Sequence, residues 1–240
     1  MPRDRLVGWI IMPAILVALF VLATVYFIKN PGGAMAARLL NWEKLSTFIT
    51  QHLMLVFVSS ALAIAAAVPF GIIVSRPYLR VIGVIVENAV NIGQTVPSIA
   101  VLALFFTVLG LGFKPAVFAL WLYSLLPILR NTYAGIKSVS PDIIEAARGM
   151  GMTPWRILTH IELPLAYPII MAGIRTAVVI NVGTATLATF INGGGLGSLI
   201  VTGINVQRIE LVLAGSILSA IMAVFFDHVL GQVESHLVNS

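Results

Sequence analysis

Six long apolar runs, separated by shorter polar stretches, constrain this chain more than any other feature. Crossing the apolar core of a bilayer, about 30 Å thick, takes about 20 helical residues, and each run supplies that many. Only 10% of the residues are charged, and the mean hydropathy is +1.03. The sequence therefore predicts a polytopic membrane protein without a second globular domain. The runs lie at about 9–28, 50–74, 81–109, 115–136, 164–191 and 209–230.

The character of the runs favours helices over strands. They are continuous and rich in Ala and Leu, whereas the strands of a membrane barrel alternate apolar and polar residues over short segments. We therefore expect an all-α integral membrane bundle. The first run is too long for the core of a signal peptide, and no small-residue cleavage site precedes the polar stretch 29–44, so we expect a retained helix.

Residues that carry chemistry are scarce. The chain has no cysteine, which excludes disulfides, thiol chemistry and Cys-based metal sites. Its histidines lack zinc-ligand spacing, no nucleophile elbow is present, and the glycines of 192–198 match no phosphate-binding pattern and indicate a tight outer connection instead. We expect no catalytic residue, no metal and no cofactor on this chain. The net charge of +5 forms no basic cluster, which argues against a nucleic-acid partner.

A polar, helix-forming segment, residues 140–164, interrupts the apolar pattern between the fourth and fifth runs. Ser140-Pro141 and Thr153-Pro154 each place a capping hydroxyl before a proline, the usual start of a helix. Gly149 and Gly151 permit the positive φ that ends a helix and turns the chain. The segment therefore predicts two short helices that form a helix-turn-helix knob at the membrane face.

Seven residues of this segment occupy every fixed position of the cytoplasmic coupling motif of ABC-transporter permease subunits. The segment therefore resembles the element that docks into an ATPase subunit. The small side chains at its centre allow the groove of a partner to approach closely. Glu145 offers a carboxylate to hydrogen-bond donors in that groove. The alternative is an amphipathic interfacial loop that has no partner. The matching residues are Glu145, Ala146, Ala147, Gly151, Ile161, Leu163 and Pro164.

Lys and Arg in the loops indicate the orientation. With a cytoplasmic N-terminus, seven of these residues lie inside and five outside, and the same orientation puts Glu145 in the cytoplasm. We therefore predict that both termini are cytoplasmic. The inside residues are Arg3, Arg5, Arg76, Arg80, Lys137, Arg148 and Arg156, and the outside residues are Lys29, Arg38, Lys44, Lys114 and Arg208.

A polar stripe runs along the third apolar run. Polar groups at this depth need partners or water, so the stripe lies either along a translocation path or against another helix, where it forms interhelical hydrogen bonds. Pro97 is expected to break the helix and free a carbonyl. Glu87, Asn91, Gln94 and Ser98 recur at helical spacing, with Asn88 beside them.

Two arginines lie within the apolar runs. Arg130, near the inner end of the fourth run, is able to extend to the cytoplasmic headgroups. Arg175 is eleven residues past Pro164, or about 16 Å along a helix, and needs a partner. Glu87 is the one carboxylate that we place deep in a run, so we expect it to pair with Arg175 or with Arg130.

Four further segments resemble the permease subunits of osmoprotectant importers for glycine betaine, choline or carnitine: 93–98, 123–135, 149–152 and 173–176. The resemblance adds Tyr123 and Asn131 to the candidate pathway residues, together with Arg175 and the polar stripe. Tyr123 either contributes to a cation–π path with Trp121 and Tyr133 or packs within the bundle.

This resemblance implies a six-helix type I ABC importer transmembrane domain in a bacterial plasma membrane. It also implies three partners: an ATPase dimer that binds Mg-ATP, a separate extracytoplasmic substrate-binding protein, and a second permease subunit, identical or related. We divide the chain into an N-terminal helix and outer loop (1–44), the permease domain (45–228) and a cytoplasmic tail (229–240).

Other functions remain as alternatives. The solute of such an importer is either an osmoprotectant or another small molecule, such as an amino acid. A secondary transporter couples to ions through paired carboxylates or repeated halves, but the sequence shows no internal repeat. A membrane enzyme requires a catalytic constellation that the sequence lacks.

Overall fold

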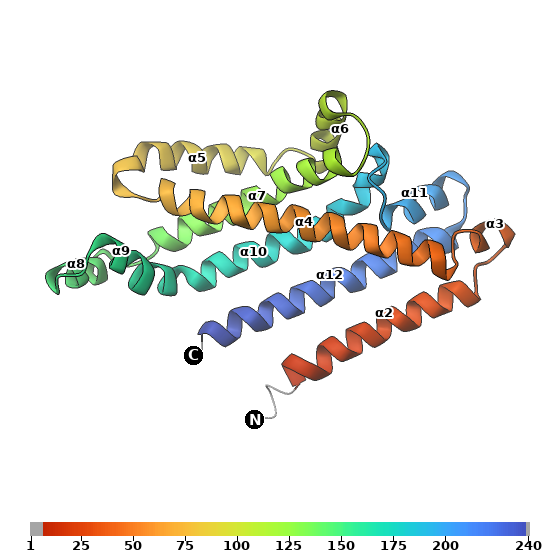
Figure 1. Cartoon of the computed structure of the whole chain (residues 1–240), viewed down its shortest axis with the longest axis horizontal. Helices are drawn as coiled ribbons and strands as arrows, with labels where there is room; N and C mark the ends of the chain where they lie inside the picture. The colour runs from red at the N-terminus through yellow and green to blue at the C-terminus, as the bar shows by residue number, and fades with distance from the viewer. Residues whose placement is uncertain (1–6, 239–240) are drawn as a thin grey trace.

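The computed structural model describes residues 7–238, and within this range every regular element is a helix (Figure 1). The short elements are η1 (Val7–Ile11), α3 (Ala34–Ala37), η2 (Pro77–Leu79), α8 (Pro141–Gly149), α9 (Pro154–Ile157), η3 (Leu158–Glu162), η4 (Thr186–Ile191) and α11 (Gly197–Asn205). The longer elements are α2 (Met12–Lys29), α4 (Trp42–Val74), α5 (Arg80–Gly93), α6 (Ser98–Leu109), α7 (Phe113–Lys137), α10 (Leu163–Ala185) and α12 (Ile209–Val238).

The long helices form an elongated bundle. Helix α4 packs against α7, α7 against α10, α10 against α12, and α12 against α2. In the part of the chain that the structure describes, five helices are long and apolar enough to cross a membrane, and the bent pair α5–α6 supplies a sixth crossing if it acts as one span. The expected all-α membrane fold is confirmed.

The third apolar run is divided into two helices. Helices α5 and α6 meet at 98°, and Pro97 stands before the first residue of α6 with an extended ψ of 131°. Proline lacks the N–H that continues a helix, and its ring clashes with the preceding turn. The expected break at Pro97 is thus confirmed, but Ser98 is separated from the rest of the polar stripe.

Small residues bring the central helices together. A Cβ on Gly71 of α4 would lie 2.8 Å from Thr132 of α7, and one on Gly173 of α10 would lie 2.4 Å from Asn131. Because lipid gives helices little hydrophobic reason to associate, such close backbone approaches stabilise membrane bundles through packing. The core therefore lies along α4, α7 and α10.

The glycine-rich connection after η4 is tightly packed, as expected. Gly194 and Gly195 have φ values of +80° and +87°, and the Gly195 N–H donates to Oε1 of Gln51 at 3.0 Å. Gly197 is buried, and an added Cβ would lie 1.8 Å from the carbonyl oxygen of Thr186. This connection therefore fixes α11 against the end of α10.

We expect Gly197→Ala to lower the free energy of unfolding by about 1–3 kcal/mol, because a methyl group there must displace backbone. The measurement is the melting temperature of the purified protein. Gly183→Ala is the matched control, since nothing lies within 4 Å of its Cβ position. Equal melting temperatures for the two variants would contradict this packing.

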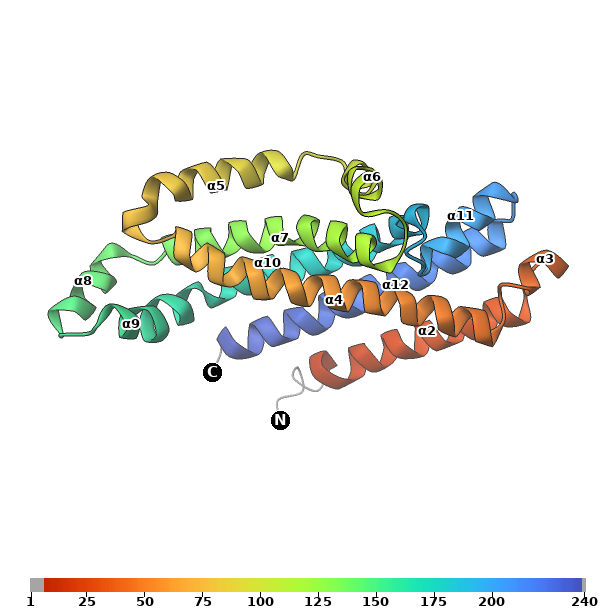
Figure 2. The ribbon, with the colours of Figure 1, turned by 45° about the horizontal axis from the view of Figure 1, so that its top comes forward.

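The two ends of the bundle carry different elements. The start of α2 and the end of α12 point toward the end that carries α8 and α9, whereas α3 and α11 lie at the opposite end (Figures 1 and 2). The ring Nε2 of His228 on α12 lies 2.7 Å from the carbonyl oxygen of Gly8, which links these two helices. This arrangement agrees with two termini on the same side as the knob.

Candidate functional site

Helices α8 and α9 and the turn between them form the knob, which extends beyond the ends of the long helices (Figure 1). Both predicted caps are present. Ser140 Oγ accepts the N–H of Asp142 at 3.3 Å, and Thr153 Oγ1 accepts the N–H of Arg156 at 3.4 Å. At each helix start, one of the N–H groups that lack an intrahelical partner is thus satisfied locally.

The turn of the knob depends on one glycine rather than two. Gly151 has φ +79°, and the N–H of Met152 donates to the carbonyl oxygen of Ala147 at 3.1 Å, the pattern of a Schellman ending. Gly149 lies in the last turn of α8 and is not among the positive-φ residues. The prediction that Gly149 also adopts a positive φ was therefore wrong.

The second half of the knob is continuous with the fifth span. Helical backbone runs from Pro154 through the π-helical turn η3 into α10 and η4, ending at Ile191. The sequence analysis expected a separate short helix before a span that begins at Pro164. Ile161 lies in η3, and Leu163 and Pro164 form the first turn of α10. A displacement of the knob therefore acts directly on α10.

The exposed surface of the knob combines charged side chains with large apolar groups. Glu145 and Ala146 are exposed, whereas Ala147 is only 1% exposed and packs inward. The expectation that both alanines form the low outer surface thus holds only for Ala146. Met150 and Trp155 are 74% and 71% exposed. Large apolar side chains that are exposed on a projecting element make the knob a candidate interaction surface.

An ion pair at the base of the knob was not predicted. Arg76 Nη1 lies 2.7 Å from Oε2 of Glu162, and it joins the end of α4 to the last residue of η3. The sequence analysis treated Arg76 only as a loop charge. The one available signal was the acid at position 162, which lies between apolar residues of the matched motif.

The polar stripe lies on a helix that packs along α7. Asn88 and Asn91 are exposed, and Glu87, Gln94 and Ser98 are partly exposed. Among residues 7–238 we find no side-chain hydrogen bond from Glu87, Asn88, Asn91 or Gln94 to another helix. The alternative, that the stripe forms interhelical hydrogen bonds within one chain, is therefore not observed.

The other candidate pathway residues lie on α7 and α10. Asn131 is half-buried between α7 and α10, beside Gly173, and its Nδ2 donates to the carbonyl oxygen of Pro127 at 2.8 Å. Tyr123 is half-exposed on α7. The predicted pathway residues are thus distributed over α5, α6, α7 and α10.

Arg175 has a different partner from the one expected. Its Nε and Nη2 donate to the two carboxylate oxygens of Asp227 at 2.6 and 2.7 Å, and Nη1 lies 3.8 Å from Oε2 of Glu234. Both acids are on α12, which packs against α10. The expected Glu87–Arg175 pair was wrong, because Asp227 of α12 supplies the carboxylate that Arg175 needs.

Arg130 does not pair with Glu87 either. Its side chain is exposed near the inner end of α7, and the described residues show no ion pair that joins it to an acid. Extension toward the headgroups, the alternative considered for this residue, remains a prediction.

A second polar contact, also not predicted, lies in the core between α4 and α10. Asn181 Nδ2 donates to Ser59 Oγ at 2.6 Å and to Ser60 Oγ at 2.9 Å. His52 Nε2 lies 3.1 Å from the carbonyl oxygen of Val182. All four side chains are buried, so these contacts hold the two helices together rather than face a path.

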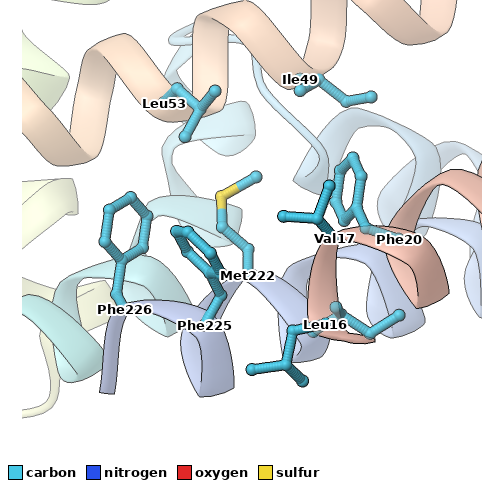
Figure 3. A pocket seen from close by; sticks show the side chains of 9 residues that line it. Leu16, Val17, Phe20, Ile49, Leu53, Met222, Phe225 and Phe226 are labelled. Atoms are coloured by element: carbon cyan, nitrogen blue, oxygen red, sulfur yellow. The ribbon is translucent and has the colours of Figure 1, made fainter. Parts of the chain in front are cut away.

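A cavity of about 160 Å³ lies among α2, α4 and α12 (Figure 3). Its walls are entirely aliphatic, aromatic or thioether groups, and no polar group points into it. A solute site needs a few convergent polar groups that fix orientation, so this cavity is a packing gap within the bundle. The lining residues are Leu16, Val17, Phe20, Ile49, Leu53, Ile221, Met222, Phe225 and Phe226.

The orientation of the bundle is testable because the chain is naturally free of cysteine. Met150 on the knob and Met35 on α3 are 74% and 51% exposed and lie at opposite ends. In sealed cells we expect an impermeant thiol reagent to label Met35→Cys and to label Met150→Cys only after permeabilisation. Labelling of Met150→Cys in intact cells would reverse the assigned orientation.

Comparison with known proteins agrees with this architecture. The chain is 46% identical over 184 residues to the glycine betaine/carnitine/choline transport system permease protein OpuCB of Bacillus subtilis, a match that covers 77% of this chain and 84% of that protein. It is 46% identical over 180 residues to the osmoprotectant import permease protein OsmY of Salmonella typhimurium, with 75% and 76% of the two chains covered.

The fold matches a solved transporter. A chain from an inward-facing structure of the MetNI methionine ABC transporter superposes with a TM-score of 0.69 and 22% identity, covering 80% of this chain and 95% of that one. Residues 67–238 match the family described as the binding-protein-dependent transport system inner membrane component. This match takes in the knob, the polar stripe and the α10–α12 contact. The chain therefore belongs to the family of binding-protein-dependent transport system inner membrane components.

Proposed function

We propose that this chain forms the transmembrane pathway of an ATP-driven importer for a small osmoprotectant of the glycine betaine, choline or carnitine type. The exposed knob carries the proposal: it presents Glu145 and a Gly151-dependent turn at one end of a bundle of apolar helices. The names of the relatives at 46% identity support the solute class.

Membership in the family of binding-protein-dependent transport components supports the proposed partners. Among residues 7–238, no group of three or more acidic or His side chains is arranged to hold a metal ion. We propose that an ATPase dimer binds Mg-ATP and docks on the knob, and that this chain binds no cofactor itself. A separate substrate-binding protein delivers the solute to the opposite end, and a second permease subunit, identical or related, completes the pathway.

The mechanism is alternating access driven from the knob. Closure of the ATPase dimer displaces the knob, and helical continuity from Pro154 to Ile191 carries this displacement into α10. Helix α10 packs against α4, α7 and α12, so its movement changes the contacts of the whole bundle. The chain itself moves and performs no hydrolysis.

The test is uptake by proteoliposomes that contain this chain, its ATPase and its binding protein. We expect glycine betaine, choline or carnitine to enter only with ATP inside, and uptake to persist after an uncoupler is added. Uptake that the uncoupler abolishes would identify an ion-coupled carrier instead. ATP-driven uptake of methionine but of none of the three osmoprotectants would overturn the solute class and leave the transporter class intact.

The polar stripe gives a further prediction. Asn91→Ala and Gln94→Ala should each lower uptake about fivefold, because each removes a hydrogen-bonding group worth about 1 kcal/mol from the proposed path. Membrane abundance should stay normal, since neither side chain holds helices of this chain together. The matched control is Ile85→Ala, an exposed apolar position on the same helix. A parallel fall of abundance and uptake would instead assign the stripe to assembly.

A further inference from the structure

The ion pair between Arg76 and Glu162, here called the clasp, lies where the knob meets the bundle. The Nη1–Oε2 distance is 2.7 Å, and the two side chains are only 20% and 9% exposed. Charge-assisted hydrogen bonds are among the strongest polar contacts in proteins, and partial exclusion of water strengthens them further. Residues 86 positions apart in sequence are thus held together at one point.

The arginine is fixed on its own helix before it reaches the glutamate. Its Nε donates to the carbonyl oxygen of Ile72 at 3.1 Å, and its Nη2 donates to Ser75 Oγ at 3.1 Å. Ser75 Oγ donates in turn to the carbonyl oxygen of Ile72 at 2.7 Å. The guanidinium is therefore part of the end of α4 rather than a freely moving side chain.

The glutamate is placed at a point where the backbone departs from α-helical geometry. Glu162 ends the π-helical turn η3, directly before α10. Wider π turns are local irregularities inside helices and recur at functional sites. The clasp therefore ties α4 to the knob at the turn that leads directly into α10.

A cavity lies beside the clasp. It measures about 240 Å³, and its walls come from the ends of α4 and α7, from α8 and from Glu162. Lys137, Glu145 and Arg148 line it but form no ion pair with one another in the described chain. Space between α8 and the bundle leaves the clasp as the charged connection that spans this junction.

We infer that the clasp is a positioning element that makes the inner end of α4 move together with the knob. This inference rests on the proposed function, since it assigns the route by which movement of the knob reaches the pathway. Helix α10 receives that movement through its own backbone, and the clasp delivers the same movement to α4. Because α4 packs against both α7 and α10, joint movement of α4 and α10 displaces the core as a unit.

The test must separate positioning from folding. Removal of one partner leaves a shielded charge unpaired and destabilises the fold, whereas neutral replacement of both partners is tolerated far better. The principal variant is therefore the double substitution Arg76→Met with Glu162→Gln. Arg76→Lys is the conservative variant, because an ammonium group keeps the ion pair. Glu43→Gln, which removes an exposed acid at the opposite end of α4, is the matched control.

The first readout uses the purified chain alone in lipid nanodiscs. Spin labels on Tyr78→Cys, 80% exposed just beyond α4, and on Met150→Cys of the knob report the distance between the two elements. We expect a single narrow distance distribution with the native clasp, with Arg76→Lys and with Glu43→Gln, and a broadened distribution in the double variant. An unchanged distribution in the double variant would overturn the inference.

The second readout uses the complete complex in proteoliposomes. We expect the double variant to retain the ATPase on purification and to hydrolyse ATP, but to take up about tenfold less solute per ATP hydrolysed. Arg76→Lys should keep most of the native ratio of solute taken up to ATP hydrolysed. A native ratio in the double variant, or loss of the bound ATPase, would show that the clasp does not transmit movement. Failure of the native complex to import any solute would refute the proposed function instead, and the nanodisc measurement would still decide whether the clasp holds α4 to the knob.

Discussion

Glu145→Lys is expected to abolish ATP-driven uptake while the protein still inserts into the membrane. Glu145 is exposed on α8, so its replacement breaks no packing, and an added lysine on the cytoplasmic side accords with the charge bias of inner loops. The reversed charge would repel the donors of the ATPase groove into which we propose that Glu145 docks. The measurement is solute uptake and ATPase co-purification from membranes with equal amounts of permease.

Gly151→Val is expected to have a similar effect for a different reason. Nothing lies within 4 Å of a Cβ at Gly151 or at Gly149, so neither substitution meets a steric obstacle. Only Gly151 has a positive φ, of +79°, which costs an L-residue about 1–2 kcal/mol and a β-branched one more. Gly149→Val is therefore a matched control: it introduces the same side chain without the strain in φ.

The two valine variants separate turn geometry from surface shape. We expect Gly151→Val to lose at least about tenfold in uptake and Gly149→Val to retain most of it. Equal losses would indicate that the surface of the turn, rather than its backbone conformation, engages the ATPase. Normal uptake and normal hydrolysis in both Glu145→Lys and Gly151→Val would show that the knob is not the coupling element.

Sequence signals that act within one segment predicted the long helices, the helix caps and the turn of the knob. The apolar runs predicted the long helices because burial in lipid acts on each segment separately. Ser140, Thr153 and Gly151 predicted the caps and the turn, because an N-cap hydroxyl and a positive φ act within a few residues. Pro97 predicted the break between α5 and α6. One proline does not indicate the angle at which the two helices meet.

Pairings between distant helices were not predicted. Arg175 and Asp227 are 52 positions apart, and Arg76 and Glu162 are 86 apart. Helical periodicity gives the face on which a residue lies, but not which helix that face contacts. The sequence analysis selected Glu87 as the partner of Arg175 from its depth alone. The structure shows that α12, rather than α5, packs along this face of α10.

Because two acids share Arg175, we expect loss of the arginine to destabilise the protein more than loss of one acid. Arg175 forms two hydrogen bonds with Asp227 and lies within 4 Å of Glu234, so one cation serves two carboxylates. Arg175→Gln leaves both carboxylates without their cation, and because the three side chains are 25–42% exposed, solvent limits the cost to about 1 kcal/mol. Asp227→Asn leaves Arg175 free to pair with Glu234, and we expect a loss below about 1 kcal/mol.

Melting temperatures of the purified protein in lipid-containing detergent measure this difference. Arg175→Gln should lower the melting temperature clearly more than Asp227→Asn does, and Arg38→Gln, in the exposed outer loop, should leave it unchanged. The double variant Arg175→Gln with Asp227→Asn should be more stable than Arg175→Gln alone, because it removes one of the two unpaired carboxylates. Residues that share one ion-pair network are expected to be non-additive in this way. If Asp227→Asn is as destabilising as Arg175→Gln, Glu234 does not act as a second partner, and the contact between α10 and α12 depends on a single ion pair.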